Sequence, residues 1–282
     1  MDGRRALWWG TVEGVGLDGL AAAAANAGFS DISITPAMYA TAIREGRTDR
    51  QLRATLAEHR VSVAVIDPLI RGLPGSLDPD RAGRRFRSTF EHGEDDCYRA
   101  ADALGARALN VAHFLGAPTP PAALVDAIGA IAHRAGTRGL DVLVEFMPEG
   151  AIPDLATAAA IVAAIDAPNC GLMFDTWHHW RCGGDVEDVR LLPPGTVRAM
   201  QLSDALDDVR NTGVAPPTSN RLLPGAGTIP LVDLVVAALG NNPSVVLGLE
   251  VFSAELSELP PDDRAARSMD AFEALLASVN RR

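Results

Sequence analysis

Short apolar runs alternate with longer helical patterns eight times along the chain, and this repetition limits the possible folds more than any other feature of the sequence. Nearly continuous apolar strands are typical of parallel sheets that are covered on both faces. The pattern therefore predicts an α/β protein. The predicted strands are Ala6–Trp9, Asp31–Thr35, Ser62–Ile66, Ala108–Ala112, Val142–Phe146, Gly171–Asp175, Val197–Leu202 and Val245–Val251.

The segments between these runs have apolar residues three and four positions apart, which indicates helices. The predicted helices are Leu17–Ala27, Asp49–His59, Ser88–Leu104, Pro121–Ala135, Leu155–Ile165, Ile229–Leu239 and Pro261–Val279, with a short one near Asp185–Leu191. Longer loops are predicted at Asp67–Asp80 and Asp204–Pro224. Loops of this length inside a compact domain often cover a substrate.

Eight such units can form either a closed barrel or an open, doubly wound sheet. The first strand is not followed by the G-x-G-x-x-G turn of a dinucleotide-binding fold. Polar residues gather instead at the ends of the later strands, where barrel enzymes have their active sites. No linker or low-complexity segment divides the 282 residues. We therefore predict a single (β/α)8 TIM barrel domain over residues 1–282.

Composition and charge argue against several classes of function. The net charge of −11 argues against a nucleic-acid partner, because such binding depends on clustered basic side chains. No apolar run approaches the roughly 20 residues that cross a bilayer, and no signal peptide is evident, so we expect a cytoplasmic protein without a membrane partner. All 25 basic residues are arginine, which excludes a lysine Schiff base. Cys97, Cys170 and Cys182 have no metal-binding spacing.

Four side chains that bind hard cations follow or end the last four strands: Glu145 in VLVEF, Asp175 in GLMFDTWHH, Gln201 in AMQLSDA and Glu250 in LGLEVFS. Oxygen ligands of this kind suit Mg2+ or Mn2+, although Co2+ and Zn2+ are also compatible. A metal would remove the cost of charges within apolar strands. The alternative is that arginines inside the barrel pair with these carboxylates. We predict one divalent ion bound by the four residues.

The sequence resembles the xylose-isomerase-like TIM barrel superfamily of sugar-phosphate isomerases and epimerases, over essentially the whole chain. The resemblance rests on VEFMPE, GLMFDTWHHW, VRAMQLSDA, RLLPGAGTIPLVDLV and LGLEVFS. It implies that Glu145 and Glu250 act as acid and base on opposite faces of a ketose. Gln201 stands where many epimerases of the family have histidine. In this respect the chain is similar to the metal-dependent 3-dehydroshikimate dehydratases of the same family.

Further site residues follow from the motifs. The resemblance implies that His178, three residues after Asp175, contacts substrate, and a dehydratase would use it as the base. Arg221 is a candidate clamp for an anionic group, because guanidinium pairs bidentately with carboxylate or phosphate. Its distance in sequence from Gln201 resembles the dehydratases. The remaining candidates for the substrate pocket are His113, Trp177 and Arg71, while Asp204 is equally well explained as a loop cap.

The leading hypothesis is an isomerase or epimerase that removes a proton next to a carbonyl of a small polyhydroxylated sugar, sugar phosphate or similar ketone. A lyase of the 3-dehydroshikimate dehydratase type is the first alternative. A non-catalytic barrel subunit is the second, and a DNA-repair barrel related to endonuclease IV is disfavoured by the charge and by too few histidines. A homodimer is expected from the family resemblance alone.

Overall fold

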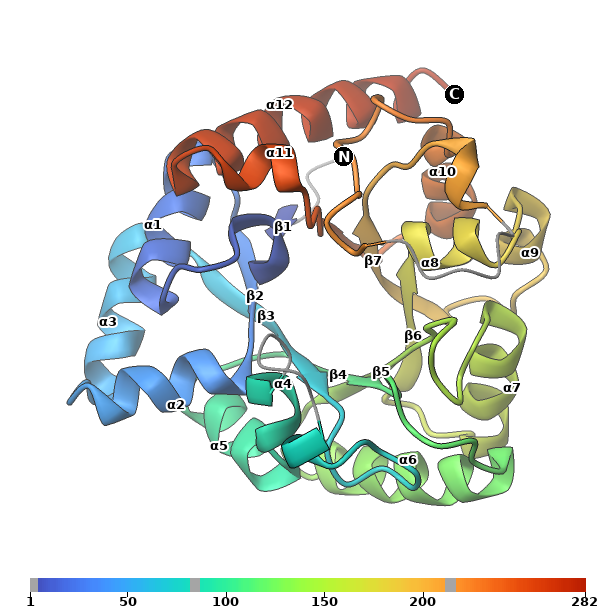
Figure 1. Cartoon of the computed structure of the whole chain (residues 1–282), viewed down its shortest axis with the longest axis horizontal. Helices are drawn as coiled ribbons and strands as arrows, with labels where there is room; N and C mark the ends of the chain where they lie inside the picture. The colour runs from blue at the N-terminus through green and yellow to red at the C-terminus, as the bar shows by residue number, and fades with distance from the viewer. Residues whose placement is uncertain (1–4, 82–86, 211–216) are drawn as a thin grey trace.

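The computed structural model describes residues 5–81, 87–210 and 217–282. Within these ranges eight parallel strands close a barrel in chain order, with β1 pairing with β8 (Figure 1). The helices form a ring around the strands. This arrangement confirms the predicted (β/α)8 barrel. Residues 211–216 of the predicted loop Asp204–Pro224 lie outside the described residues.

The strand predictions agree closely with the structure. The strands are β1 (Arg5–Leu7), β2 (Asp31–Ile34), β3 (Ser62–Leu69), β4 (Ala108–Ala112), β5 (Asp141–Glu145), β6 (Cys170–Asp175), β7 (Val197–Leu202) and β8 (Val246–Leu249). The largest difference is in β3, which continues three residues beyond Ile66. The segment from Asp67 to Leu69 was predicted to begin a loop, because a proline in this position usually ends a strand.

The helices are α1 (Leu17–Ala27), α2 (Pro36–Arg44), α3 (Asp49–His59), α4 (Arg87–Glu91), α5 (Glu94–Leu104), α6 (Pro121–Gly136), α7 (Leu155–Ile165), α8 (Thr176–Arg181), α9 (Val186–Arg190), α10 (Leu231–Asn241), α11 (Ala254–Ser257) and α12 (Pro261–Val279). Short 3-10 turns are η1 (Trp9–Val12), η2 (Pro79–Arg81) and η3 (Asp207–Val209).

One helix prediction was wrong, and three helices of the described chain, α2, α8 and α11, were not predicted. The predicted helix Ser88–Leu104 is divided into α4 and α5, with Gly93 in extended backbone at the start of α5. Helix α2 was not predicted, although its start carries a clear signal: Thr35 Oγ1 accepts a hydrogen bond from Met38 N at 3.1 Å, and Pro36 occupies the first helical position.

Strand residues divide between two cores because successive side chains point to opposite faces. A small cluster from β1, β3, β4, β5, β6 and β7, with Trp8 and Met173 among its members, fills the barrel. The larger cluster includes Val144, Phe174 and Met200 and packs the strands against the helices. Gly248 makes room for the indole of Trp8, since a Cβ there would lie 1.9 Å from the ring.

Thr11 in η1 connects the turn after β1 to the end of β8. Its hydroxyl donates to the carbonyl oxygen of Leu249 and accepts from the backbone N–H of Val251, both at 3.0 Å. These bonds join the beginning of the described chain to the end of its last strand. The turn that carries Trp9 is therefore held against the loop that carries Glu250.

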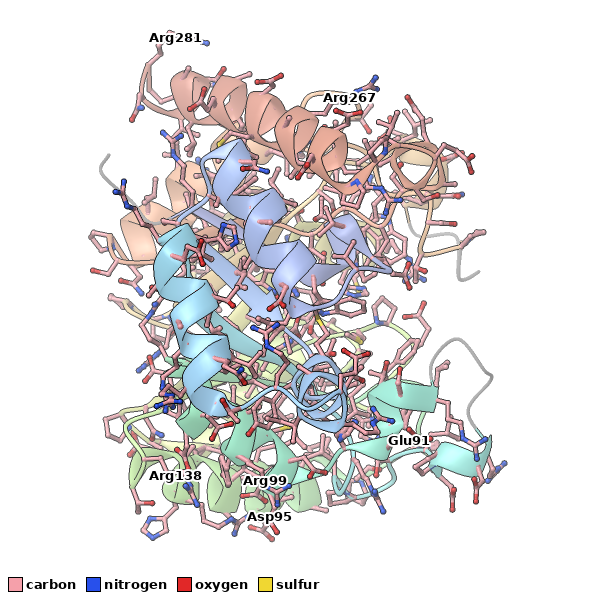
Figure 2. All side chains as sticks on the ribbon, turned by 90° about the vertical axis from the view of Figure 1, so that its left-hand side faces the viewer. Glu91, Asp95, Arg99, Arg138, Arg267 and Arg281 are labelled. Carbon is pink, nitrogen blue, oxygen red and sulfur yellow. The ribbon has the colours of Figure 1, made fainter. Side chains whose placement is uncertain are left out.

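Charged side chains such as Asp95, Arg99 and Arg267 lie on the outer faces of the helices (Figure 2). No helix among the described residues combines the length and the apolar character needed to cross a membrane. The outer ring thus presents charged side chains away from the barrel.

Candidate active site

Strand alternation explains why the predicted ligands lie together inside the barrel. Glu145 ends β5, Asp175 ends β6, Gln201 lies in β7 and Glu250 directly follows β8. The residues just before them pack against the helices, so these four side chains point inward. All four are at most 4% exposed. Strand register also places Asp175 directly beside Gln201.

Arg221 lies among these carboxylates. Its Nη1 atom donates to Asp175 Oδ2 at 2.7 Å, to Glu250 Oε2 at 3.1 Å and to the Glu250 carbonyl oxygen at 3.2 Å. The guanidinium is 3% exposed. Two of the predicted metal ligands are thus already paired with an arginine, which is the alternative that the sequence left open. Glu145 and Gln201 have no such partner among the described residues.

Two polar residues that the sequence analysis missed complete the cluster. Asn110 lies in β4, and its Nδ2 atom donates to Asp67 Oδ1 at 2.7 Å and to Glu145 Oε2 at 2.6 Å. Asp67 lies in β3 and is 2% exposed. Asn110 therefore connects Asp67 to Glu145 and fixes the position of the glutamate. The only sequence signal for this pair was a polar residue inside each of two apolar strands.

The electrostatics of the cluster favour an added cation. Burial raises the pKa of Glu145 well above its ordinary value, and the charges of Asp67, Glu250 and Asp175 raise it further. Burial likewise raises the pKa of Glu250, although Arg221 opposes this effect. Burial is also the main reason that the pKa of Asp67 rises to about 6. Crowded carboxyl groups thus hold protons that a divalent ion would replace.

Asp175 is the exception. Burial tends to raise its pKa, but Arg221 and hydrogen bonds from the backbone of α8 keep the pKa below its ordinary value. Its Oδ1 atom caps α8 by accepting from Trp177 N at 2.7 Å and His178 N at 3.1 Å. One oxygen of Asp175 therefore begins a helix while the other faces Arg221.

His178 joins the cluster as predicted. Its Nε2 atom lies 3.8 Å from Glu145 Oε1 and 3.7 Å from Asp175 Oδ2. Glu145, Asp175 and His178 offer ligand atoms that all lie within 4.8 Å of one another and that could hold a metal ion. Burial lowers the pKa of His178 to about 4, so its imidazole is neutral at pH 7. A neutral imidazole can bind a metal or accept a proton.

The unpaired polar atoms support a metal at this place. Gln201 Oε1 is buried and has no hydrogen-bond partner among the described residues, and the same is true of His178 Nδ1. A buried acceptor without a partner is costly. Gln201 Oε1 belongs to the side chain next to Asp175 in register, so a cation there would satisfy it. The residues present fit a divalent ion with oxygen and imidazole ligands.

Trp177 and Asp204 support the position of Arg221. The guanidinium of Arg221 lies 4.8 Å from the centre of the Trp177 ring, which Arg181 also contacts at 4.5 Å. Asp204 forms a β-bridge with Leu222 and accepts hydrogen bonds from Gly225 N and Ile229 N. Asp204 therefore acts as an organiser of the loop after Arg221, and neither Trp177 nor Asp204 lines the pocket described below.

His113 and Arg71 lie away from the carboxylates. His113 Nδ1 accepts from Ala151 N at 3.1 Å, so its Nε2 carries the proton and donates to the Pro74 carbonyl oxygen at 3.1 Å. His113 thus joins the loops after β3 and β5. Arg71 is exposed and donates to the carbonyl oxygen of Glu91. Neither residue lines the pocket, and their substrate-binding roles remain predictions.

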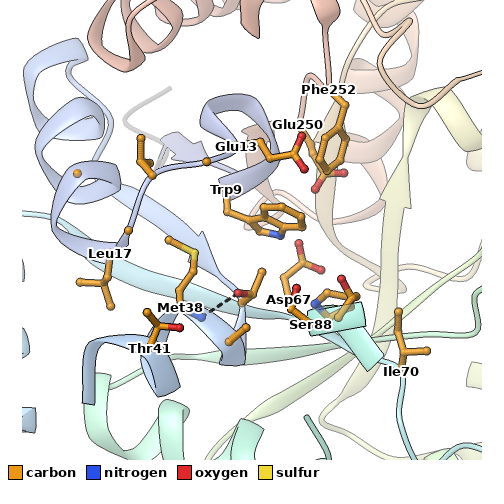
Figure 3. Close-up of a pocket in the computed structure, with 18 of the residues that line it drawn as sticks. Trp9, Glu13, Leu17, Met38, Thr41, Asp67, Ile70, Ser88, Glu250 and Phe252 are labelled. Atoms are coloured by element: carbon orange, nitrogen blue, oxygen red, sulfur yellow. Dashed lines mark hydrogen bonds between the residues drawn. The ribbon is translucent and has the colours of Figure 1, made fainter. Parts of the chain in front are cut away.

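A pocket of about 650 Å3 opens above the cluster. Glu145, His178, Gln201, Arg221 and Glu250 line one end of it. Figure 3 shows Trp9, Asp67, Glu250 and Phe252 facing one another at this end, and Leu17, Met38 and Thr41 at the other. The cluster is therefore accessible to a small molecule, while its charged groups remain largely shielded from water.

Comparison with known proteins agrees with the barrel fold. A family model of xylose isomerase-like TIM barrels matches residues 21–275. A 3-dehydroshikimate dehydratase from Pseudomonas aeruginosa is 28% identical over 203 residues, which make up 70% of this chain and 29% of the dehydratase. The chain thus spans less than a third of the length of that curated relative.

Solved structures show the same fold at low sequence identity. The IolI protein with a bound zinc atom superimposes with a TM-score of 0.83 at 16% identity, over 98% of this chain and 99% of that protein. A D-psicose 3-epimerase superimposes with a TM-score of 0.70 at 15% identity, over 98% and 99% of the two chains.

Proposed function

This chain belongs to the xylose isomerase-like TIM barrel family, and we propose that it is a divalent-metal-dependent isomerase or epimerase of a polyhydroxylated ketone. The observation that carries the proposal is that Glu145 and Glu250 reach one pocket from two different strands, each with a raised pKa. An epimerase needs one group that removes a proton and another that returns it.

The metal would be held by Glu145, Asp175, Gln201 and Glu250, with His178 beside them. When bound, it would supply stabilisation of the negative charge that develops on the carbonyl oxygen of the substrate. Manganese and magnesium suit the carboxylate ligands best, and zinc or cobalt suits the imidazole.

The side chains of this chain supply the proton transfers. Glu145 is kept in position by Asn110 and removes the proton next to the carbonyl, while Glu250 returns a proton from the other side of the pocket. Arg221 keeps Asp175 ionised and neutralises part of the charge of Glu250. Neutral His178 can donate or accept a hydrogen bond at a substrate oxygen.

A lyase of the 3-dehydroshikimate dehydratase type is the second candidate. Gln201 and Arg221 resemble the dehydratases of this family, and the curated relative carries that name. Such an enzyme removes the same kind of proton and then expels water, with His178 as its base. The hydrogen bonds of Arg221 to Asp175 and Glu250 run through Nη1, and its Nε has no hydrogen-bond partner among the described residues, so donors remain for the carboxylate of this substrate.

One experiment distinguishes the isomerase or epimerase reaction from the lyase reaction. The protein is loaded with Mn2+ or Mg2+, and the exchange of carbon-bound protons into deuterated water is followed by NMR with ketoses, ketose phosphates and 3-dehydroshikimate. Exchange with an epimeric product supports the isomerase or epimerase, whereas an aromatic product from 3-dehydroshikimate supports the lyase.

Isosteric variants test the assigned residues. Glu145→Gln and Glu250→Gln are expected to lower both the bound metal and the exchange rate, while the exposed Glu91→Gln is expected to behave like the wild-type protein. No exchange with any substrate, together with unchanged metal content in Glu145→Gln, would leave the non-catalytic barrel as the better description.

A further inference from the structure

The pocket extends well beyond the carboxylate cluster. Its volume of about 650 Å3 falls within the roughly 300–1,000 Å3 of pockets that enclose drug-sized ligands. A small sugar at the cluster would occupy only the end that Glu145 and Glu250 line. The other end lies between the segment that leads into α1 and the start of α2 (Figure 3). Something larger than a free sugar is therefore needed to fill the pocket.

We call this other end the distal arm, and its members share apolar side chains: Val15, Leu17, Ala37, Met38 and Ala42. Leu17 and Ala42 are buried, while the other members are partly exposed. Methionine adapts its shape to flat ligands and makes favourable contacts with aromatic rings. These five side chains form a surface suited to an apolar group, although the same end of the pocket also has polar lining residues, among them Glu13, Thr41 and Glu45.

Aromatic rings connect the distal arm to the cluster. The rings of Trp9 and Phe252 meet edge to face with their centres 5.4 Å apart, and both line the pocket. Gly10 permits this contact, because a Cβ there would lie 2.3 Å from the Phe252 ring. Phe252 also lies 5.3 Å from the guanidinium of Arg221. An apolar surface therefore continues from the charged cluster into the distal arm.

The charges of the pocket disfavour an anionic substituent. Among the described residues the acidic lining side chains outnumber the arginines: they are Glu13, Asp18, Glu45, Asp67, Glu145 and Glu250, against Arg47 and Arg221. Arg47 forms an ion pair with Asp18, and Arg221 pairs with Asp175 and Glu250. A phosphate in the distal arm would therefore meet acidic groups, and both arginines of the described lining already have carboxylate partners.

We infer that the substrate is an uncharged polyhydroxylated ketone that carries an apolar substituent of about the size of an aryl ring. The hydroxylated part lies at the carboxylate cluster, and the substituent lies in the distal arm against Met38. This inference rests on the proposed function for the reaction, but it concerns the opposite end of the pocket and different residues.

The test is equilibrium binding to the Mn2+-loaded protein, measured by calorimetry with matched series built on the ketohexoses fructose, tagatose and sorbose. Each series contains the 6-O-methyl ether, the 6-O-phenyl ether and the 6-phosphate of the ketose, so that only the substituent at O6 changes. In at least one series the phenyl ether is expected to bind at least tenfold tighter than the methyl ether, and the 6-phosphate more weakly than the phenyl ether.

Two variants test whether the phenyl group binds in the distal arm. Met38→Glu adds a charge to the distal arm, and Ala37→Trp fills it. Each is expected to reduce the phenyl preference to less than threefold while the methyl ethers bind as before. The exposed Leu191→Glu is the matched control, because Leu191 does not line the pocket and is 76% exposed.

Three results would overturn the inference: equal binding of the phenyl and methyl ethers or of neither, tightest binding of a 6-phosphate, or a phenyl preference that survives both arm variants. Failure of the proposed function looks different. In that case proton exchange is absent and Glu145→Gln keeps its metal, while a phenyl preference that depends on Met38 and Ala37 persists.

Discussion

Arg221 Nη1 donates to Asp175 Oδ2 at 2.7 Å, and this buried ion pair ties the loop after β7 to the end of β6. The same nitrogen reaches Glu250. Arg221 thus provides, inside the barrel, part of the positive charge that the carboxylate cluster requires. A divalent ion bound as proposed would share these carboxylates with Arg221, so the stability of the protein should report on both.

The first prediction concerns Arg221→Met. The variant leaves Asp175 and Glu250 without their cationic partner, and loss of one member of a buried ion pair costs about 3–5 kcal/mol. We expect that loss in the metal-free protein and a clearly smaller one in the Mn2+-loaded protein. Thermal unfolding with and without Mn2+ measures both. Arg267→Met, on the exposed face of α12, is the control. An equal loss in both states would contradict a shared role for metal and arginine.

Gln201→Leu is expected to weaken metal binding without lowering the stability of the metal-free protein. Within residues 5–81, 87–210 and 217–282 the buried Oε1 atom has no hydrogen-bond partner, and such an atom costs about 1–3 kcal/mol. The metal-free variant is therefore expected to be as stable as the wild-type protein or more stable, while its affinity for Mn2+ falls at least tenfold. Gln201→His, which keeps a ligand atom, is expected to retain binding. Unchanged Mn2+ affinity of the leucine variant in a calorimetric titration would exclude Gln201 as a ligand.

Asp67 makes the stability of the metal-free protein depend on pH. Burial raises its pKa from 3.8 to about 6, so the folded chain holds a proton that the unfolded chain has already lost. The contribution of Asp67 therefore becomes less favourable as the pH rises from about 4 to about 6. Asp67→Asn removes this effect and should gain stability relative to the wild-type protein over that range, by at most roughly 3 kcal/mol.

Urea unfolding of the metal-free Asp67→Asn protein at several pH values measures this gain. Asp95→Asn is the control, because Asp95 lies on the exposed face of α5. A difference from the wild-type protein that stays constant between pH 4 and pH 7 would show that Asp67 keeps its charge in the folded chain.

His113→Ala is expected to affect stability without affecting the metal. The imidazole joins two loops through hydrogen bonds to Ala151 N and the Pro74 carbonyl oxygen. Loss of both bonds should lower the free energy of unfolding by about 1–3 kcal/mol. Mn2+ affinity should stay within twofold of the wild-type value, and the exposed His133→Ala should change neither quantity. A selective loss of substrate binding would instead support the substrate contact that the sequence suggested.

The sequence predicted the barrel and the inward carboxylates because both depend on local periodicity. Glu145 and Glu250 each interrupt an apolar strand at a position that must face the barrel interior, and the strand order then places them together. Asp67 was missed because Asp-Pro after an apolar run resembles the start of a loop. In the structure β3 continues to Leu69, so Asp67 faces the cluster instead.

The partners of the charged groups could not be predicted. Arg221 lies in a loop far along the chain from Asp175, and bridges from its two neighbours, Leu222 to Asp204 and Asn220 to Ser253, fix where its side chain enters the barrel. Asn110 is a neutral residue in an apolar strand, which gives no indication of the two carboxylates that it joins. Contacts of this kind depend on loop paths, and periodicity carries no information about those paths.

The hydrogen bonds of Thr11 to Leu249 and Val251 join the two ends of the barrel, which determines when the pocket can form during synthesis. The pocket draws on residues from Trp9 to Phe252, so no partial chain contains it. During synthesis the edge of β1 that pairs with β8 stays open until the last strand has left the ribosome. The proposed metal site would be complete only when that edge is closed, because Glu250 directly follows β8.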